Sequence, residues 1–299
     1  MRIFLTGATG FVGSRIVPEL LAAGHQVLGL ARSDAGARQL AEAGAGIHRG
    51  TVADLASLRA GAEQADAIIH TAFVHDFTTY AANCAADREA IRAMGTVLRG
   101  SDRPFLVTSA CTLGDAGDGA PALESVFDPS SPAPRAATER AVEDVLQMGV
   151  DARVVRLPQV HDPVRQGLIT FYIDHARRHG MAGYVGEGAD RWSAGHVSDV
   201  ARLYSLALTH GKAGARYHAA AEEGVLFRQV AEAVATGLDV PAVALPATDA
   251  ADHFGWLAAF IGRNGAASST WTRAQLDWQP HGPGLVADLQ AMNYAAPPV

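Results

Sequence analysis

Three glycines follow the first apolar run of the chain at a spacing of three residues. The run is Ile3 to Leu5, and the segment after it reads Thr-Gly-Ala-Thr-Gly-Phe-Val-Gly. Apolar residues recur at helical spacing from Gly13 to Leu21, so a glycine turn joins a predicted strand to a predicted helix. Such a turn lets the backbone approach a ligand closely, and the N–H groups at the start of the helix favour an anion. The segment predicts a site for the pyrophosphate of a dinucleotide, formed by Gly7, Thr9, Gly10, Phe11, Val12 and Gly13.

The residues after the second predicted strand, 26–31, indicate which dinucleotide is bound. At this place of a dinucleotide-binding fold an acid hydrogen-bonds the free 2′-hydroxyl of the adenosine ribose, whereas a basic side chain accommodates a 2′-phosphate. Here the strand is followed by Arg32 and Ser33, which can both donate hydrogen bonds to a phosphate. We therefore expect NADP(H) rather than NAD(H). The alternative is a solvated Arg32 with Asp34 as the N-cap of the next helix, which is compatible with either cofactor.

Two stretches far apart in the chain resemble one protein family. The Gly-x-x-Gly-x-x-Gly spacing after Thr6 is similar to that of the extended and atypical branches of the short-chain dehydrogenase/reductase superfamily. Residues 268–280 look like the segment Ser-x-Lys/Arg-x-x-x-Leu-Gly-Trp-x-Pro of these branches, with Asp277 in place of the glycine. The nearest resemblance is to the NAD-dependent epimerase/dehydratase proteins. It implies further cofactor contacts from Asp54, Leu55, Thr71, Ala72, Thr108 and Pro158, although Asp54 can equally be a helix N-cap.

The resemblance also places the catalytic positions, and two of them hold unexpected residues. Ser109 takes the place of the serine or threonine that hydrogen-bonds the substrate oxygen; the alternative is a hydroxyl that only closes a strand end. The family's Tyr-x-x-x-Lys pair is replaced by Arg135 and Glu139. An arginine stays protonated and cannot give up a proton near neutral pH, but it can polarise a carbonyl, bind a substrate carboxylate or hold a phosphate. The alternative is an ion pair between Arg135 and Glu139 along one helix.

His161 is the candidate for the missing proton donor. It stands in the tyrosine position of a segment that resembles the family's Arg-x-x-Asn-Val-Tyr-Gly-Pro, and an imidazole titrates near neutral pH. The alternative is a loop histidine held by Asp162. His70, at the end of a buried predicted strand, is expected instead to be a core histidine with satisfied hydrogen bonds.

These residues need a scaffold in which strands and helices alternate. Up to residue 157 the pattern predicts six strands with helices between them, which is typical of an α/β fold with a Rossmann-type doubly wound parallel sheet. After Pro158 the pattern loosens into helices at 168–179, 198–209 and 227–236 and a strand at 215–219. We expect a nucleotide-binding domain over 1–160 and a smaller, partly interleaved substrate lobe over 161–299. The long segment 114–134 is expected to be a lid or a substrate loop.

Composition narrows the class of partners. The 299 residues are 48% hydrophobic and carry a formal net charge of −7, which favours a large buried core and argues against nucleic acid or acidic membrane surfaces as partners. With only Cys84 and Cys111, neither a disulfide framework nor a zinc site is expected. No apolar stretch reaches the ~20 residues that span a bilayer, and the chain begins directly with a predicted strand. We therefore expect a cytoplasmic protein with a small-molecule substrate.

Three functions are compatible with these features. The leading hypothesis is an NADP(H)-dependent oxidoreductase that moves a hydride to or from a small or medium carbonyl, alcohol or related substrate, since the cofactor carries the chemistry. The second is a non-catalytic NADP(H)-binding redox sensor or regulator, because the cofactor loop is kept while the catalytic pair is lost. The third is a nucleotide-sugar epimerase or dehydratase, against which the missing pair counts more strongly. The resemblance also implies a homodimer through the predicted helices 80–99 and 135–148.

Overall fold

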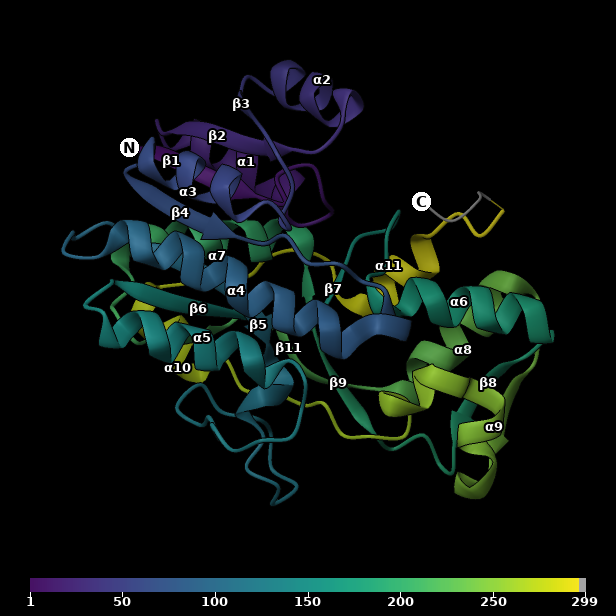
Figure 1. The fold of residues 1–299 in the computed structure, drawn as a ribbon. Coiled ribbons are helices and arrows are strands. Elements are labelled where there is room, and N and C mark those ends of the chain that lie inside the picture. The colour runs from purple at the N-terminus through teal and green to yellow at the C-terminus, as the bar shows by residue number, and fades with distance from the viewer. Residues whose placement is uncertain (296–299) are drawn as a thin grey trace.

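A central sheet of seven parallel strands organises the protein, whose computed structural model describes residues 1–295 (Figure 1). The strands lie in the order β10-β6-β5-β4-β1-β2-β3, so the chain starts inside the sheet, runs to one edge and then returns past its starting strand. This is the doubly wound arrangement that the alternation of strands and helices predicts. The strands are β1 (Arg2–Thr6), β2 (Gln26–Ala31), β3 (Gly46–Arg49), β4 (Ala67–His70), β5 (Phe105–Ala110), β6 (Ala152–Leu157) and β10 (Arg216–His218).

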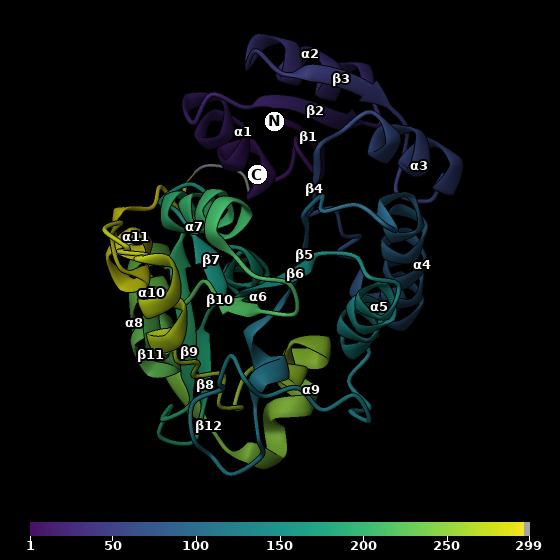
Figure 2. The ribbon, with the colours of Figure 1, turned by 90° about the vertical axis from the view of Figure 1, so that its left-hand side faces the viewer.

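Helices cover both faces of this sheet (Figure 2). On one face α1 (Gly13–Ala22) packs against α7 (Val197–His210), and on the other α3 (Leu55–Glu63), α4 (Tyr80–Leu98) and α5 (Ala136–Gln147) lie side by side. Between β2 and β3 the chain forms α2 (Asp34–Glu42). Each long helix buries an apolar stripe; in α4 the stripe holds Ile91, Met94 and Leu98. Within residues 1–295, none of the helices combines the length and the apolar character that a membrane span requires.

Part of the C-terminal half packs on the central sheet and belongs to the same unit as the N-terminal half. Tyr204 of α7 and Tyr217 of β10 are buried in the same core cluster as Ile16 of α1. The rest forms a smaller lobe with its own core around Tyr172, Phe227 and neighbouring side chains. The elements of this lobe are β7 (Gln159–His161), α6 (Leu168–His179), β8 (Ala182–Val185), β9 (Arg191–His196), β11 (Glu222–Leu226), α8 (Phe227–Leu238), β12 (Ala242–Leu245), α9 (Ala250–Phe254) and α11 (Leu285–Ala291). The helix α10 (Thr270–Leu276) packs instead against α7 and β10, and its Leu276 is buried in the same core cluster as Ile16.

The segment 114–134 is held to the rest of the protein by tertiary contacts at residues 122–126. Ala122 forms a bridge with Ala267, and the carboxylate of Glu124 accepts hydrogen bonds from both the N–H and the hydroxyl of Thr272, each at 2.9 Å. The buried guanidinium of Arg156 donates to two carbonyl oxygens of the same segment. These bonds favour a fixed wall over the mobile lid that the length of the segment indicated.

Candidate functional site

The glycine turn forms a tight cradle at the carboxyl edge of the central sheet. Gly7 has a φ of +72°, and a Cβ atom there would lie only 2.6 Å from the hydroxyl oxygen of Thr71. A Cβ atom on Gly13 would overlap the Gly7 carbonyl oxygen, so both positions require glycine. Within residues 1–295 the N–H groups of Phe11 and Val12 donate to no protein acceptor, although they stand at the start of α1. The cradle therefore fits a dinucleotide pyrophosphate, which these N–H groups would bind.

An exposed basic side chain, Arg32, directly follows the end of β2. The Arg32 side chain is exposed and makes no hydrogen bond or ion pair with any residue that the structure describes. Ser33 is the N-cap of α2, because its hydroxyl oxygen accepts from the N–H of Gly36 at 3.2 Å; the N-cap is therefore not Asp34, as the sequence alternative had it. Asp34 instead pairs with Arg49 at 2.5 Å. Asp34 is thus engaged in an ion pair, whereas the Arg32 guanidinium is available to bind a ligand.

The other predicted cofactor residues line the same edge of the sheet. Asp54 is the N-cap of α3 and accepts from the N–H of Ser57 at 3.0 Å, which confirms the capping alternative without excluding an adenine contact. The remaining positions are Leu55 at the start of α3, Thr9 in the glycine turn, Thr71 and Ala72 directly after β4, Thr108 in β5 and Pro158 between β6 and β7. The structure therefore brings the predicted cofactor contacts together.

Arg135 is held firmly where β5 ends. Its guanidinium donates to the carbonyl oxygen of Thr108 at 2.8 Å and to the carboxylate of Asp87 at 3.2 Å. The same group lies over the ring of Phe73, 4.0 Å from the ring centroid. The side chain is still 13% exposed, and a guanidinium has five N–H groups, so further donors remain for a ligand. The ion pair with Glu139 that helical spacing suggested is not formed, because both side chains have tertiary partners.

A buried chain of polar side chains positions Asp87 and, through it, Arg135. The hydroxyl of Thr6 lies 2.7 Å from Nδ1 of His70, and Nε2 of His70 lies 3.0 Å from one oxygen of Asp87. The other oxygen of Asp87 accepts from the hydroxyl of Thr138 at 2.5 Å. Burial alone would raise the pKa of Asp87, but the charge of Arg135 and the bond to His70 outweigh it and lower the pKa. His70 is therefore a core histidine with both ring nitrogens bonded, as expected.

Ser109 and Glu139 meet in a buried ionic cluster between β5 and α5. The side chain of Glu139 is fully buried; it accepts two hydrogen bonds from Arg156, one from Arg216 and one from the hydroxyl of Ser109, each at 2.8 Å. Burial would raise the pKa of Glu139, but the hydrogen bonds and charge of Arg156 lower it. His218 lies 3.2 Å from Arg156 and completes the cluster. This geometry favours a structural role for both residues over contact with a substrate.

His161 is enclosed by the C-terminal lobe. Its Nδ1 lies 2.7 Å from the carboxylate of Asp288 in α11, so Asp288 and not Asp162 holds the ring. Burial lowers the pKa of His161, although Asp288 acts in the opposite direction. The side chain has no exposed surface, and its Nε2 atom has no partner within residues 1–295. The enclosure favours a link between β7 and α11 over a proton donor.

The connection between β4 and α4 brings aromatic side chains to Arg135 that sequence reasoning did not assign. The ring of Tyr80 lies 5.9 Å from that of Phe73 and stacks on Phe77 at 5.4 Å, between ring centroids. Phe77 in turn stacks on Trp256 of the C-terminal lobe at 4.3 Å. The sequence signal for them is the density of aromatic residues directly after the fourth predicted strand.

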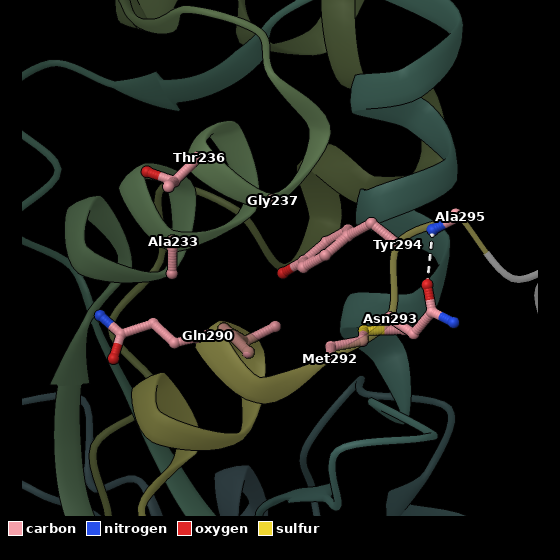
Figure 3. A pocket seen from close by; sticks show the side chains of 9 residues that line it. Ala233, Thr236, Gly237, Gln290, Met292, Asn293, Tyr294 and Ala295 are labelled. Atoms are coloured by element: carbon pink, nitrogen blue, oxygen red, sulfur yellow. Dashed lines mark hydrogen bonds between the residues drawn. The ribbon is translucent and has the colours of Figure 1, made fainter.

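Two surface cavities lie in the C-terminal lobe, and neither includes a residue of the glycine turn. One, of about 360 Å³, lies between α8 and the segment after α11, where the ring of Tyr294 faces Gly237 (Figure 3). The other, of about 570 Å³, lies between α6 and α9 and is lined by His175, His253 and Trp256 among others. In the part of the chain that the structure describes, no group of three acidic, histidine or cysteine side chains could hold a metal ion.

Comparisons with known proteins agree with this architecture. Residues 3–220 match the NAD dependent epimerase/dehydratase family. The chain is 40% identical to the uncharacterized protein YLL056C of Saccharomyces cerevisiae over 298 residues, 99% of each chain. It is also 40% identical to the uncharacterized protein C2A9.02 of Schizosaccharomyces pombe over 295 residues, 98% of this chain and 100% of the other. The structure of Thermus thermophilus UDP-glucose 4-epimerase in complex with NAD is similar, with 21% identity, a TM-score of 0.75 and 99% of each chain covered. The chain belongs to the NAD dependent epimerase/dehydratase family.

Proposed function

We propose that the protein is an NADP(H)-dependent oxidoreductase that moves a hydride to or from a small or medium carbonyl, alcohol or related substrate. The observation that carries the proposal is the fixed guanidinium of Arg135 at the end of β5, on the edge of the sheet where the glycine turn would hold the cofactor. A bound nicotinamide supplies the hydride chemistry. The protein would supply binding, orientation and charge, and Arg135 is its best-placed charge.

Arg135 would stabilise the negative charge that develops on the substrate oxygen. Its position is fixed by Thr108, Asp87 and the ring of Phe73, so little reorganisation is needed when that charge appears. Removal of one pre-positioned donor of this kind lowers kcat by about 10²–10³-fold. Because the guanidinium keeps its own proton, a separate group must supply the proton of the product alcohol.

The preference for NADP(H) rests on Arg32. Its exposed guanidinium and the neighbouring Ser33 hydroxyl would meet a ribose 2′-phosphate, whereas the nearby acid, Asp34, is engaged with Arg49. The similar structure of the T. thermophilus epimerase contains NAD. The preference for NADP(H) is therefore argued from Arg32 and Ser33 of this chain and not from that similarity.

Consumption of reduced cofactor with a panel of carbonyl compounds tests the function. The panel contains ketones, aldehydes, imines and quinones, and the absorbance of the reduced nicotinamide is followed with wild-type protein and with Arg135→Met. We expect turnover of at least one class by the wild type and a loss of about 10²–10³-fold in the variant. Tight cofactor binding with no turnover across the panel would contradict the proposal and favour the redox sensor.

The family and the T. thermophilus epimerase support a second candidate, a nucleotide-sugar epimerase or dehydratase. UDP-glucose therefore belongs in the panel, with product sugars separated by chromatography. Conversion of UDP-glucose without net consumption of cofactor would favour this candidate over the oxidoreductase.

A further inference from the structure

Thr108, Ser109 and His70 lie near Arg135, but their hydroxyl and imidazole groups are engaged within the protein. The hydroxyl of Thr108 lies 2.8 Å from the carbonyl oxygen of His70 and 2.6 Å from the hydroxyl of Tyr204. The Ser109 hydroxyl donates to Glu139, and both ring nitrogens of His70 have partners. All of these side chains are buried, so none of them presents a proton to a ligand.

Tyr80 differs from these groups in its position and exposure. It is the first residue of α4 and is partly exposed. Its ring and the guanidinium of Arg135 both pack on the ring of Phe73, at 5.9 Å and 4.0 Å between centres. Tyr80 and the Arg135 guanidinium thus share the Phe73 ring beside the end of β5.

We propose that Tyr80 and Arg135 replace the missing tyrosine–lysine pair, with Tyr80 as the proton donor and Arg135 as the cation that holds the substrate oxygen. This inference rests on the proposed function. In the reductive direction the O–H bond of Tyr80 breaks and its proton goes to the carbonyl oxygen, which receives the C=O π electrons. The carbonyl carbon gains the hydride of the reduced cofactor, which is oxidised by two electrons. The Tyr80 phenolate then takes a proton from solvent.

The surroundings of Tyr80 keep its hydroxyl protonated at neutral pH. Burial raises the pKa of Tyr80 to about 12, and the charge of Arg135 opposes this rise. The phenol therefore stays protonated throughout the neutral range, which is the state that a proton donor needs.

The first test compares Tyr80→Phe with Tyr184→Phe, a matched loss of a tyrosine hydroxyl in β8 of the C-terminal lobe. With the carbonyl substrate found in the panel, Tyr80→Phe is expected to lose about 10²–10⁴-fold in kcat, the usual worth of a general acid. Its NADPH dissociation constant and melting temperature should match those of the wild type, and Tyr184→Phe should keep its activity. A Tyr80→Phe protein that keeps about a third of wild-type kcat or more would overturn the assignment.

A second test measures the interaction between Tyr80 and Arg135 without relying on turnover. The protein is labelled with 3-fluorotyrosine, the Tyr80 resonance is identified by its absence from Tyr80→Phe, and its fluorine shift is titrated with pH. Arg135→Met is expected to move the Tyr80 titration to higher pH, and Arg135→Lys is expected to restore most of the shift. Identical midpoints in the wild type and Arg135→Met would overturn the pairing. Failure of the wild type on the whole panel overturns the proposed function, whereas a Tyr80→Phe protein with about a third of wild-type kcat or more overturns only the role of Tyr80.

Discussion

Glu139→Ala is expected to destabilise the fold strongly, because this carboxylate is the only negative group that directly bonds Arg156 among the described residues. Both side chains have 0% exposed surface, and Arg156 donates two hydrogen bonds to Glu139 at 2.8 Å. Removing one partner of a buried ion pair leaves an uncompensated charge and costs about 3–5 kcal/mol. For a chain of 299 residues that corresponds to a fall in melting temperature of roughly 5–8 °C.

The neighbouring Glu143 provides the control for this prediction. It lies one turn further along α5 and also pairs with Arg216, but its side chain is 43% exposed. Glu143→Ala is therefore expected to cost less than about 1 kcal/mol. Urea unfolding followed by circular dichroism measures both variants. Equal stability of the two variants would refute the structural role of Glu139. A Glu139→Gln protein of wild-type stability without turnover would return Glu139 to the active site.

Three further expectations concern separate parts of the molecule. Arg32→Asp should weaken NADPH binding by about 10–150-fold, which corresponds to the loss of a hydrogen bond to a charged group. Calorimetric titration should show NADH binding unchanged, and equal losses for both nucleotides would exclude a 2′-phosphate contact. Burial and the charge of Arg156 lower the pKa of His218 to about 4. Because the unfolded chain then binds a proton at this residue more readily than the folded chain does, the free energy of unfolding should fall as the pH drops from about 6.5 towards 4. Urea midpoints at several pH values measure this, and His218→Gln should flatten the dependence. Asp288→Asn should cost about 1.5–3 kcal/mol of stability through its bond to His161 while NADPH binding stays within about twofold; a selective loss of turnover would instead support a catalytic His161.

Local sequence patterns were enough to predict the first strand, the glycine turn and the helix after it. The positive φ of Gly7 and the close approach of Gly13 leave no room for other residues, so strand, turn and helix are encoded within a dozen neighbouring positions. The same holds for the helix start after β2, where only the choice between Ser33 and Asp34 as N-cap was missed. Both residues are good N-caps, and the backbone conformation decides between them.

The catalytic positions depended on tertiary contacts that spacing does not reveal. Helical spacing allows Arg135 to reach Glu139, but Asp87 of α4 and Arg156 of β6 lie nearer to them. His161 and its partner Asp288 are separated by 127 residues. Periodicity shows which side chains share one face of an element, whereas the packing of elements decides which charges meet. Sequence reasoning therefore found Arg135 and missed its partners.

Calorimetric titration of the purified protein with NADPH and then with NADH measures whether the glycine turn and Arg32 bind the cofactor. We expect one NADPH bound per chain, with an affinity at least about tenfold above that for NADH, because Arg32 would add a contact to the 2′-phosphate. Absence of binding by both nucleotides would contradict the cofactor site at the glycine turn and every role derived from it.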